Sequence, residues 1–371
     1  MKTIDDFIKE HDIPENYELE RFIESFYDNP EDVTKLKSAY KKLSICEDSN
    51  QAPQNIQKVK RIILLGEMRF KSLRKVAPKL DYADPTKLSY EMKNGKIKVD
   101  DGEYKFTVDE SDKEGTIVFV RSGYKDPHIS FLINSIIKMG ITVINDPNYV
   151  NISNNKYLLA NLLQQHDIPQ PKFILVSKSD IHKGDDDDLQ DKLKKIYRKL
   201  DDDTKFVCKI LGGHGGRGVF ICKKSNITSV LQTFFAIDEE CKILVQEFCE
   251  IEEGDIRVHV LTLNGKQEIV SVTMRAKGGK DFRTNLSLGN SQINDIKLTP
   301  EQKKIALDTA KASGLIWCGV DLLPLKNGKT YVIEYNGAPG PPSELTTDQE
   351  TLEKTNEEFY TNLIDTINKL C

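Results

Sequence analysis

A glycine-rich loop between two apolar runs limits most strongly how this 371-residue chain can fold. Residues 206–210 and 219–222 have the aromatic and β-branched composition of strands, and five of the seven residues 212–218 are glycine. Residues 213–218 satisfy G-x-G-x-x-G, but a dinucleotide-binding fold needs a helix directly after that motif, and a P-loop needs GK[ST]. Two strands around the loop instead predict a flap whose backbone amides close over phosphate groups.

The flap prediction extends to the strand lysine that precedes it. Lys209 lies two residues before the loop, where a strand lysine can reach the same phosphates. The plainer alternative is a hairpin with a glycine-rich tip, but this many glycines together with a histidine and an arginine exceed what a turn needs. The predicted flap residues are Gly213, His214, Gly215, Gly216, Arg217 and Gly218.

A second pattern is a hairpin that carries carboxylates. If Asn327 and Gly328 are the centre of a two-residue type I′ turn, Asp321 lies directly opposite Glu334. Asn336 shares the face of Glu334, and cross-strand pairs are about 5 Å apart at Cβ. Two carboxylates and an amide are hard oxygen ligands, which suit Mg²⁺ or Mn²⁺ shared with phosphates.

The same register raises a conflict near the tip of this hairpin. It places Pro324 opposite Tyr331 at a hydrogen-bonded position, and proline has no N–H to donate. We therefore expect a bulge or a longer loop there.

Basic residues gather between the flap and the hairpin. Arg275, Lys277, Lys280 and Arg283 fall within nine residues after a predicted strand over 268–274, and such a cluster would neutralise phosphate and carboxylate charge. The strand over 242–248 ends in polar residues, and its exposed backbone could pair with an adenine edge.

Composition excludes several other classes of protein. The 53 basic and 58 acidic side chains leave a net charge of -5, which argues against non-specific binding to nucleic acid or an anionic membrane. No apolar run approaches the ~20 residues that span a bilayer, and we expect no secretory signal in the charged N-terminal segment. The seven cysteines form no CxxC pair, which favours free thiols in the cytoplasm.

Strand and helix patterns also indicate how the chain is organised. Residues 1–45 have helical spacing and precede a polar linker. Strands predicted over 61–65, 116–120 and 141–144, with a helix over 129–139 between the last two, are typical of an α/β domain with parallel pairing.

Taken in chain order, these motifs resemble the ATP-grasp superfamily, and most closely its RimK-type branch of carboxylate–amine (alpha-L-glutamate) ligases. The resemblance covers about residue 60 to the C-terminus and is sharpest from Phe206 to Gly340. The segments that carry it are Val245-Gln246-Glu247-Phe248, Asp255-Ile256-Arg257, Arg275-Ala276-Lys277, Asp281-Phe282-Arg283-Thr284-Asn285, Gly319-Val320-Asp321 and Glu334-Tyr335-Asn336-Gly337-Ala338-Pro339-Gly340.

The resemblance implies an ATP-grasp fold of mixed α+β and α/β architecture. The implied divisions are a helical N-terminal extension and linker over 1–58, a pre-ATP-grasp α/β domain over 59–148, an ATP-grasp subdomain with the flap over 149–240, and a C-terminal subdomain with the metal site over 241–371.

The resemblance also implies where ATP binds, between two α+β subdomains. Lys156 and Lys209 would hold the phosphates under the flap. Gln246, Glu247 and Phe248 would hold adenine at the hinge, Asp255 would lie near the nucleoside, and Arg283 and Asn285 would line the phosphate and acceptor side.

The implied reaction centre lies on the carboxylate hairpin. Asp321, Glu334 and Asn336 would bind two Mg²⁺ ions, with Mn²⁺ as an alternative, and Arg275 and Arg283 would be catalytic. Arg275 in particular would stabilise an acyl phosphate and the tetrahedral intermediate.

The resemblance implies an ADP-forming ligase that joins an amino acid, with glutamate as the main expectation, to a peptide or protein. Many members of the family are homo-oligomers. Three alternatives stay open at this point: a ligase that closes lactam or ester crosslinks in a peptide, a phosphotransferase on the same fold, and an ATP-binding interaction protein without turnover. Departures from the family pattern, such as His214 and Arg217 in the flap, concern acceptor specificity.

Overall fold

The computed structural model describes residues 58–66, 71–181, 187–212, 218–251, 253–276, 291–294, 296–342 and 349–371. The chain divides after residue 53 into two units, and the description below concerns the second. The predicted helices of residues 1–45 lie outside the described residues.

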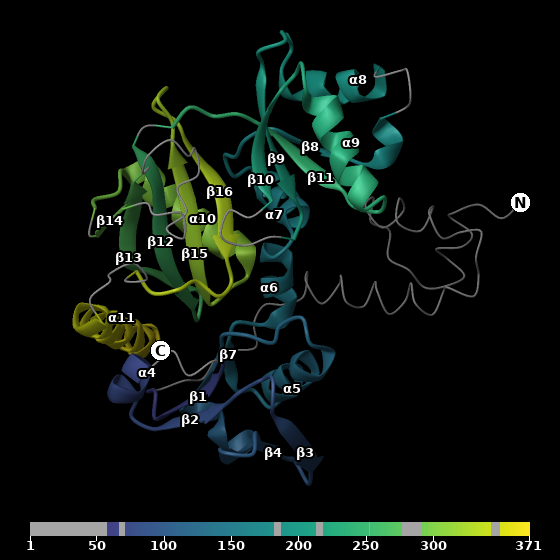
Figure 1. Ribbon diagram of the computed structural model, residues 1–371. Coiled ribbons are helices and arrows are strands. Elements are labelled where there is room, and N and C mark those ends of the chain that lie inside the picture. The colour runs from purple at the N-terminus through teal and green to yellow at the C-terminus, as the bar shows by residue number, and fades with distance from the viewer. Residues whose placement is uncertain are drawn as a thin grey trace, which may run out of the picture. The chain divides into compact units, whose positions relative to one another are not determined.

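The first sheet of the described chain is parallel, with the spatial order β2-β1-β6-β7; β1, β2 and β7 are labelled in Figure 1. Every residue of β6 is buried, as expected of a strand covered on both faces. This confirms the predicted α/β part. The strands are β1 (Arg61–Leu65), β2 (Leu80–Ala83), β6 (Thr116–Val120) and β7 (Thr142–Ile144), and the helices are α4 (Lys71–Val76) and α5 (Pro127–Lys138).

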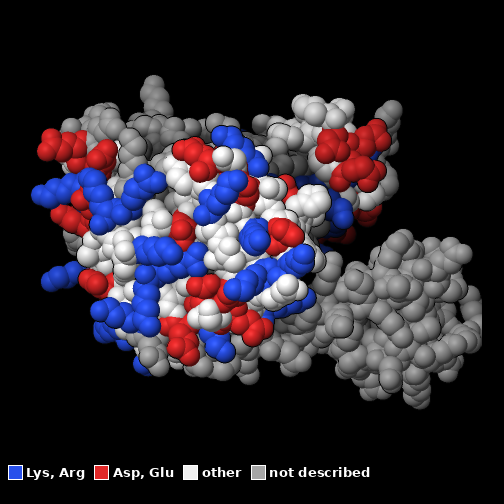
Figure 2. Space-filling view, turned by 90° about the horizontal axis from the view of Figure 1, so that it is seen from below, with Lys and Arg blue, Asp and Glu red and all other residues white. Residues whose placement is uncertain are grey.

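A three-stranded antiparallel sheet, β3-β4-β5, extends this part. Its exposed side chains form ion pairs, such as Lys96 with Asp109 at 3.2 Å and Lys105 with Asp100 at 2.7 Å. On the face drawn in Figure 2, basic and acidic side chains are interspersed. The elements are β3 (Ser89–Lys93), β4 (Lys96–Asp100), β5 (Lys105–Asp109) and the 3-10 helix η2 (Glu110–Glu114).

A second antiparallel sheet, of order β10-β9-β11-β8, has an apolar core of its own. Phe206 and Cys208 point into that core, and Lys209 lies on the other face of β9. The elements are β8 (Phe173–Val176), η3 (Lys178–Asp180), α8 (Asp187–Ile196), β9 (Lys205–Ile210), β10 (Val219–Lys223), α9 (Ile227–Ile237) and β11 (Ile243–Glu247).

The largest sheet is five-stranded, with the order β14-β13-β12-β15-β16. Its apolar residues share cores with the parallel sheet: Val258 and Val320 lie in one cluster with Val118, and Trp317 lies in another with Phe119. The elements are β12 (Gly254–Leu263), β13 (Lys266–Ala276), β14 (Ser291–Asn294), β15 (Trp317–Pro324), β16 (Thr330–Asn336), α10 (Pro300–Ser313) and α11 (Gln349–Leu370).

Two consecutive helices, α6 (Pro147–Ser153) and α7 (Lys156–Gln165), lead from β7 to the second antiparallel sheet. Asn155 caps α7, because its side chain accepts hydrogen bonds from the N–H groups of Tyr157 and Leu158. This cap makes Lys156 the first residue of the helix. None of the helices in the described part is both long and apolar enough to cross a membrane.

The β15–β16 hairpin corrects the predicted turn and confirms the predicted pairing. Asp321 lies opposite Glu334, as expected. Between Asp321 and Leu322 the register shifts by one residue, and beyond it Pro324 pairs with Thr330. The N–H of Leu325 donates to the carbonyl of Lys329 at 2.8 Å, so Asn327 and Gly328 are not the centre of a two-residue turn.

The loop is longer by one residue, with Gly328 at φ +81°. The expected bulge is also present, and it compensates for the longer loop. The pairing of Asp321 with Glu334 therefore holds although the predicted turn is wrong.

Candidate functional site

One face of the five-stranded sheet brings together polar side chains from four strands. Thr273, Arg257, Asp321 and Glu334 form one row across β13, β12, β15 and β16. The row on one side of it contains Ser271, His259, Gly319 and Asn336. On its other side Arg275 pairs with Asp255. The three predicted metal ligands and Arg275 thus lie on neighbouring positions of one surface.

Two arginines surround Asp321, which is 0% exposed. Arg257 donates to it from Nε at 2.7 Å and from Nη2 at 2.8 Å. Arg275 donates to the same carboxylate from Nη2 at 2.8 Å and also forms an ion pair with the buried Asp255. Asp255 therefore partners Arg275 in this structure, next to the predicted metal set.

This network controls the charge of its members. Burial alone would raise the pKa of Asp321, but Arg257 and Arg275 outweigh it and hold the pKa well below its ordinary value. Burial would lower the pKa of Arg275, and Asp321 and Asp255 together raise it instead. All of these groups are therefore charged at neutral pH.

A buried histidine lies behind this charged row. His259 is 0% exposed and accepts a hydrogen bond at Nδ1 from the indole N–H of Trp317 at 3.2 Å. Burial, with the positive charge of Arg257 as the next cause, lowers its pKa to about 3. The imidazole is therefore neutral, and Nε2 carries its proton.

Two lysines from other elements lie in the field of Glu334. Lys209 is 7% exposed, and burial lowers its pKa to about 8, against the opposing field of Glu334. Burial also lowers the pKa of Lys156, and Glu334 again opposes the shift. The backbone N–H of Lys156 donates to the carbonyl of Leu211 at 3.1 Å, which joins the start of α7 to the loop after β9.

The predicted adenine hinge lies at the end of β11. Gln246 is buried there, and the Glu247 carboxylate accepts a hydrogen bond from the N–H of Lys172 at 3.2 Å. The N–H of Phe248 donates to the hydroxyl of Tyr197 at 2.9 Å, and that hydroxyl donates to the carbonyl of Phe248 at 3.3 Å. An adenine edge at Phe248 would therefore compete with Tyr197.

Several predicted residues lie outside the described part of the chain. They are Gly213, His214, Gly215, Gly216, Arg217, Arg283 and Asn285, and the same holds for Lys277 and Lys280 of the basic cluster. Gly218 is described: its φ is +71°, and its carbonyl accepts from the N–H of Ile210 at 2.9 Å. It closes the hairpin at the base of the predicted flap.

Arg257 belongs to the site, although from the sequence it was identified only as part of a motif and given no role. In Asp255-Ile256-Arg257 the two charged residues share one face of a strand, so the spacing held a signal. The partner of Arg257 depends on the order of the strands in the sheet. Because β15 pairs with β12, Asp321 lies opposite Arg257. Tyr197, at the end of α8, had no comparable signal.

A cavity of about 480 Å³ lies beside the hairpin, at the carboxyl end of β6. Because β2 and β6 flank β1 on opposite sides, this edge is a topological switch point, where open α/β sheets bind ligands. Its lining includes Arg121, Ser122 and Lys125, from the segment between β6 and α5, and Ala338, which lies two residues after Asn336.

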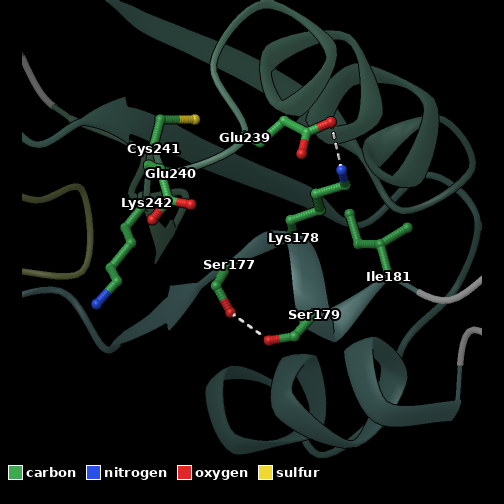
Figure 3. A pocket seen from close by; sticks show the side chains of 8 residues that line it. All are labelled: Ser177, Lys178, Ser179, Ile181, Glu239, Glu240, Cys241 and Lys242. Carbon is green, nitrogen blue, oxygen red and sulfur yellow. Dashed lines mark hydrogen bonds and ion pairs between the residues drawn. The ribbon is translucent and has the colours of Figure 1, made fainter.

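A second cavity, of about 560 Å³, lies where β8 ends and β11 begins (Figure 3). In it Lys178 pairs with Glu239 at 2.6 Å, and the hydroxyls of Ser177 and Ser179 are 2.9 Å apart. Gln246 lies toward the opposite end of β11. None of the predicted site residues that the structure describes lines this cavity.

The donor set on the hairpin fits a hard divalent cation. The Asp321 carboxylate uses three of its roughly four lone-pair sites on guanidinium groups, counted over the described residues. Asn336 is half-buried, and its buried Nδ2 has no hydrogen-bond partner in the described chain. No three His, Cys, Asp or Glu side chains gather at a metal-binding spacing among the described residues, and the predicted set contains only two carboxylates.

Comparisons with known proteins identify the same family that the sequence motifs resemble. Residues 153–355, more than half of the chain, match the RimK-like ATP-grasp domain family. A probable alpha-L-glutamate ligase of Vibrio atlanticus is 33% identical over 204 residues, which are 54% of this chain and 61% of that protein. The match thus spans less than two thirds of the relative's length.

Solved structures share the fold at lower identity. D-alanyl-alanine synthetase A from Vibrio cholerae is 14% identical, with a TM-score of 0.55 over 85% of this chain and 99% of that one. The ATP-grasp ligase PsnB, complexed with minimal precursor, Mg and ADP, is also 14% identical, with a TM-score of 0.57 over 84% of this chain and 97% of that one. These likenesses confirm the predicted fold class, and the chain belongs to the RimK-like ATP-grasp family.

Proposed function

We propose that this protein is an ATP-dependent carboxylate–amine ligase that joins glutamate, or a similar amino acid, to a carboxylate of a peptide or protein. The observation that carries the proposal is the cross-strand pair Asp321–Glu334, with two desolvated lysines, Lys156 and Lys209, in the field of Glu334. Opposed carboxylates beside buried cations suit a metal–nucleotide complex, whose phosphates are anionic and whose metal is cationic.

The reaction has two balanced steps. A substrate carboxylate oxygen attacks the γ-phosphorus of ATP, and the bond between that phosphorus and the ADP oxygen breaks. The amine nitrogen then attacks the acyl carbon, the carbon–oxygen bond to phosphate breaks, and the amine loses a proton. The products are an amide, ADP and phosphate, and no protein nucleophile is required.

The residues of this chain would act through charge and position. Mg²⁺ held by Asp321, Glu334 and Asn336 would neutralise the phosphate oxygens and make the γ-phosphorus more electrophilic. Lys156 and Lys209 would hold the phosphates with their positive charge. Arg275 uses Nε and Nη2 for Asp255 and Asp321, so we assign its Nη1 to the acyl phosphate.

We place a substrate in the 480 Å³ cavity beside the hairpin. Arg121, Ser122 and Lys125 offer donors to a carboxylate there, and Ala338 brings the cavity next to the strand that carries Glu334 and Asn336. An enzyme that consumes ATP also fits the reducing cytoplasm that the free thiols, such as Cys208 and Cys318, favour.

The test is to incubate the protein with Mg·ATP and a panel of amino acids and peptides, and to measure ADP, phosphate and product mass. We expect ADP and phosphate in equal amounts only when both a carboxylate and an amine are present. Glu334→Gln should abolish this turnover, whereas the matched exposed variant Glu358→Gln should keep it.

Other results would replace the proposal. Phosphate that stays on the product would indicate a phosphotransferase, and ATP binding without turnover on any substrate pair would indicate an interaction protein.

A peptide crosslinking ligase is the second candidate. It is favoured by the shared fold with PsnB, whose structures contain a precursor peptide. Mass spectrometry of the peptide product separates the two: a gain of a glutamyl residue supports the first candidate, and the loss of one water supports the second.

A further inference from the structure

Asn145, directly after β7, makes a saturated set of hydrogen bonds to a distant part of the chain. Its Nδ2 donates to the carbonyls of Trp317 at 2.7 Å and Gly337 at 2.6 Å. Its Oδ1 accepts from the N–H groups of Ile316 at 2.8 Å and Trp317 at 3.0 Å. An amide side chain has two N–H groups and two acceptor lone pairs, so every one is used, and the residue is 1% exposed.

The four bonds join the two strands of the carboxylate hairpin at its open end. Trp317 begins β15, directly after Ile316 and four residues before Asp321, and Gly337 directly follows Asn336 at the end of β16. One side chain from the parallel sheet therefore fixes where one strand enters the site and where the other leaves it.

Close packing holds the segment after β16 in the same place. A Cβ on Gly337 would lie 2.8 Å from Cγ2 of Val150, and a Cβ on Gly319 would lie 2.7 Å from Cβ of Pro339. Arg121 donates from Nη2 to the carbonyl of Pro339 at 2.8 Å. The segment that Asn145 binds thus has little room to shift.

The opposite end of the hairpin sets the register of the carboxylates only through a bulge. Between Asp321 and Leu322 the pairing shifts by one residue. β15 and β16 therefore pair in one register near the tip and in another at the site. A one-residue slip turns side chains to the other face of a sheet. The bonds of Asn145 at the open end add a second constraint, which opposes such a slip at Asp321 and Glu334.

We infer that Asn145 is a positioning residue that sets the register of β15 against β16, and with it the spacing of Asp321, Glu334 and Asn336 for a divalent cation. The inference rests on the proposed function, because it assigns a purpose to the geometry of the proposed metal site. It goes beyond that function in naming a residue that contacts neither metal nor nucleotide.

The test measures how much Mg²⁺ tightens the binding of ADP to the full chain. The affinity for ADP is determined by calorimetry in EDTA and again in Mg²⁺, and the ratio of the two dissociation constants is the readout. Asn145→Asp keeps the shape and both acceptors, but it places an oxygen against the carbonyls of Trp317 and Gly337. We expect the ratio to fall at least about tenfold, with affinity in EDTA changed by less than about twofold.

Two further variants separate positioning from stability. Asn362→Ala removes a comparable amide bond, from Nδ2 to the carbonyl of Val270 at 2.8 Å, at a place remote from the hairpin, and it should leave the ratio unchanged. Asn145→Ser has a side chain too short to bond the carbonyl of Gly337, and it adds no charge. It tests the inference if the aspartate variant does not fold.

The outcomes distinguish the inference from the function on which it rests. A folded Asn145 variant with the wild-type ratio overturns the inference and leaves the proposed function standing. A wild-type ratio near one, with no effect of Mg²⁺ on ADP binding, overturns both.

Discussion

Arg257 holds both carboxylate oxygens of Asp321 across two neighbouring strands, with distances of 2.7 and 2.8 Å. Arg275 adds a third bond to the same carboxylate and a second ion pair to Asp255, so the two arginines balance two aspartates. Glu334 is not part of this pairing. Its negative charge therefore makes the sheet surface attractive to a cation, while the network beneath keeps Asp321 ionised.

Replacing Arg257 with Met should lower the free energy of unfolding by about 3–5 kcal/mol, because it leaves a fully buried carboxylate with one partner fewer. Urea unfolding measures the change. Lys304→Met is the matched control: it breaks an exposed pair with Asp308 and should cost less than about 1 kcal/mol. Equal losses in the two variants would show that the Arg257 pair adds no stability.

Glu334→Gln and Asp321→Asn should differ in stability while both lose ligase activity. Asp321→Asn removes the partner of two buried arginines and should unfold at clearly lower urea. Among the described residues no hydrogen bond to the Glu334 carboxylate is found, so its amide variant should unfold near the wild-type midpoint. A stable, fully active Glu334→Gln protein would remove Glu334 from the metal set.

Nucleotide affinity should fall as the pH rises through about 8, the pKa to which burial lowers Lys209. Phosphates bind the protonated amine, so ATP must draw a proton onto Lys209 above that pH. Calorimetry at pH 8.5 in buffers of different ionisation enthalpy should detect this proton uptake. Lys209→Arg stays charged and should make the affinity less dependent on pH between 7.5 and 9.5; an unchanged profile would exclude Lys209 as the source.

Stability should fall as the pH decreases from 6.5 toward 3, in part because of His259. Its pKa is about 3 in the folded protein against 6.5 as the ordinary value, so the unfolded chain binds one proton more in that window. The expected contribution to the slope is about 1.4 kcal/mol per pH unit. Urea unfolding of His259→Gln between pH 5 and 6.5 should show a flatter slope than wild type, and parallel slopes would mean that His259 is protonated when folded.

Gly218→Ala should destabilise the base of the flap more than Gly95→Ala destabilises its turn. Both glycines have φ +71°, so the strain of the left-handed backbone is shared. At Gly218 the new Cβ would lie 2.9 Å from Cδ1 of Ile210, whereas nothing lies within 4 Å at Gly95. We expect an excess cost of about 1–3 kcal/mol by urea unfolding. Equal costs would mean that Ile210 moves aside freely.

The sequence predicted most of the strands that build the site, because their residues are continuous apolar or β-branched runs. It also predicted that Asp321 faces Glu334, but through a turn that the structure contradicts. The longer loop and the bulge offset each other. In the sequence, Pro324 indicated that one of them was needed, but not that both are present. Local propensity selects turn types, whereas the final register depends on bonds made elsewhere.

The partners of the site residues were harder to predict than the residues. Arg257 follows Asp255 by two positions, yet its bond to Asp321 depends on β12 lying beside β15. Asn145 binds groups 171–192 positions away, and nothing in its local sequence marks it. Sheet order and long-range side-chain bonds are properties of the packed chain, so periodicity along the sequence cannot reveal them.

The bulge between Asp321 and Leu322 has a consequence for how this hairpin can be altered. Because it separates two registers, the turn at the exposed residues 327 and 328 can change in length without carrying a slip to the carboxylates. The exposed tip is therefore a place where a loop, a tag or a fluorescent label can be inserted, and where related chains can diverge, at little cost to the chemistry below it.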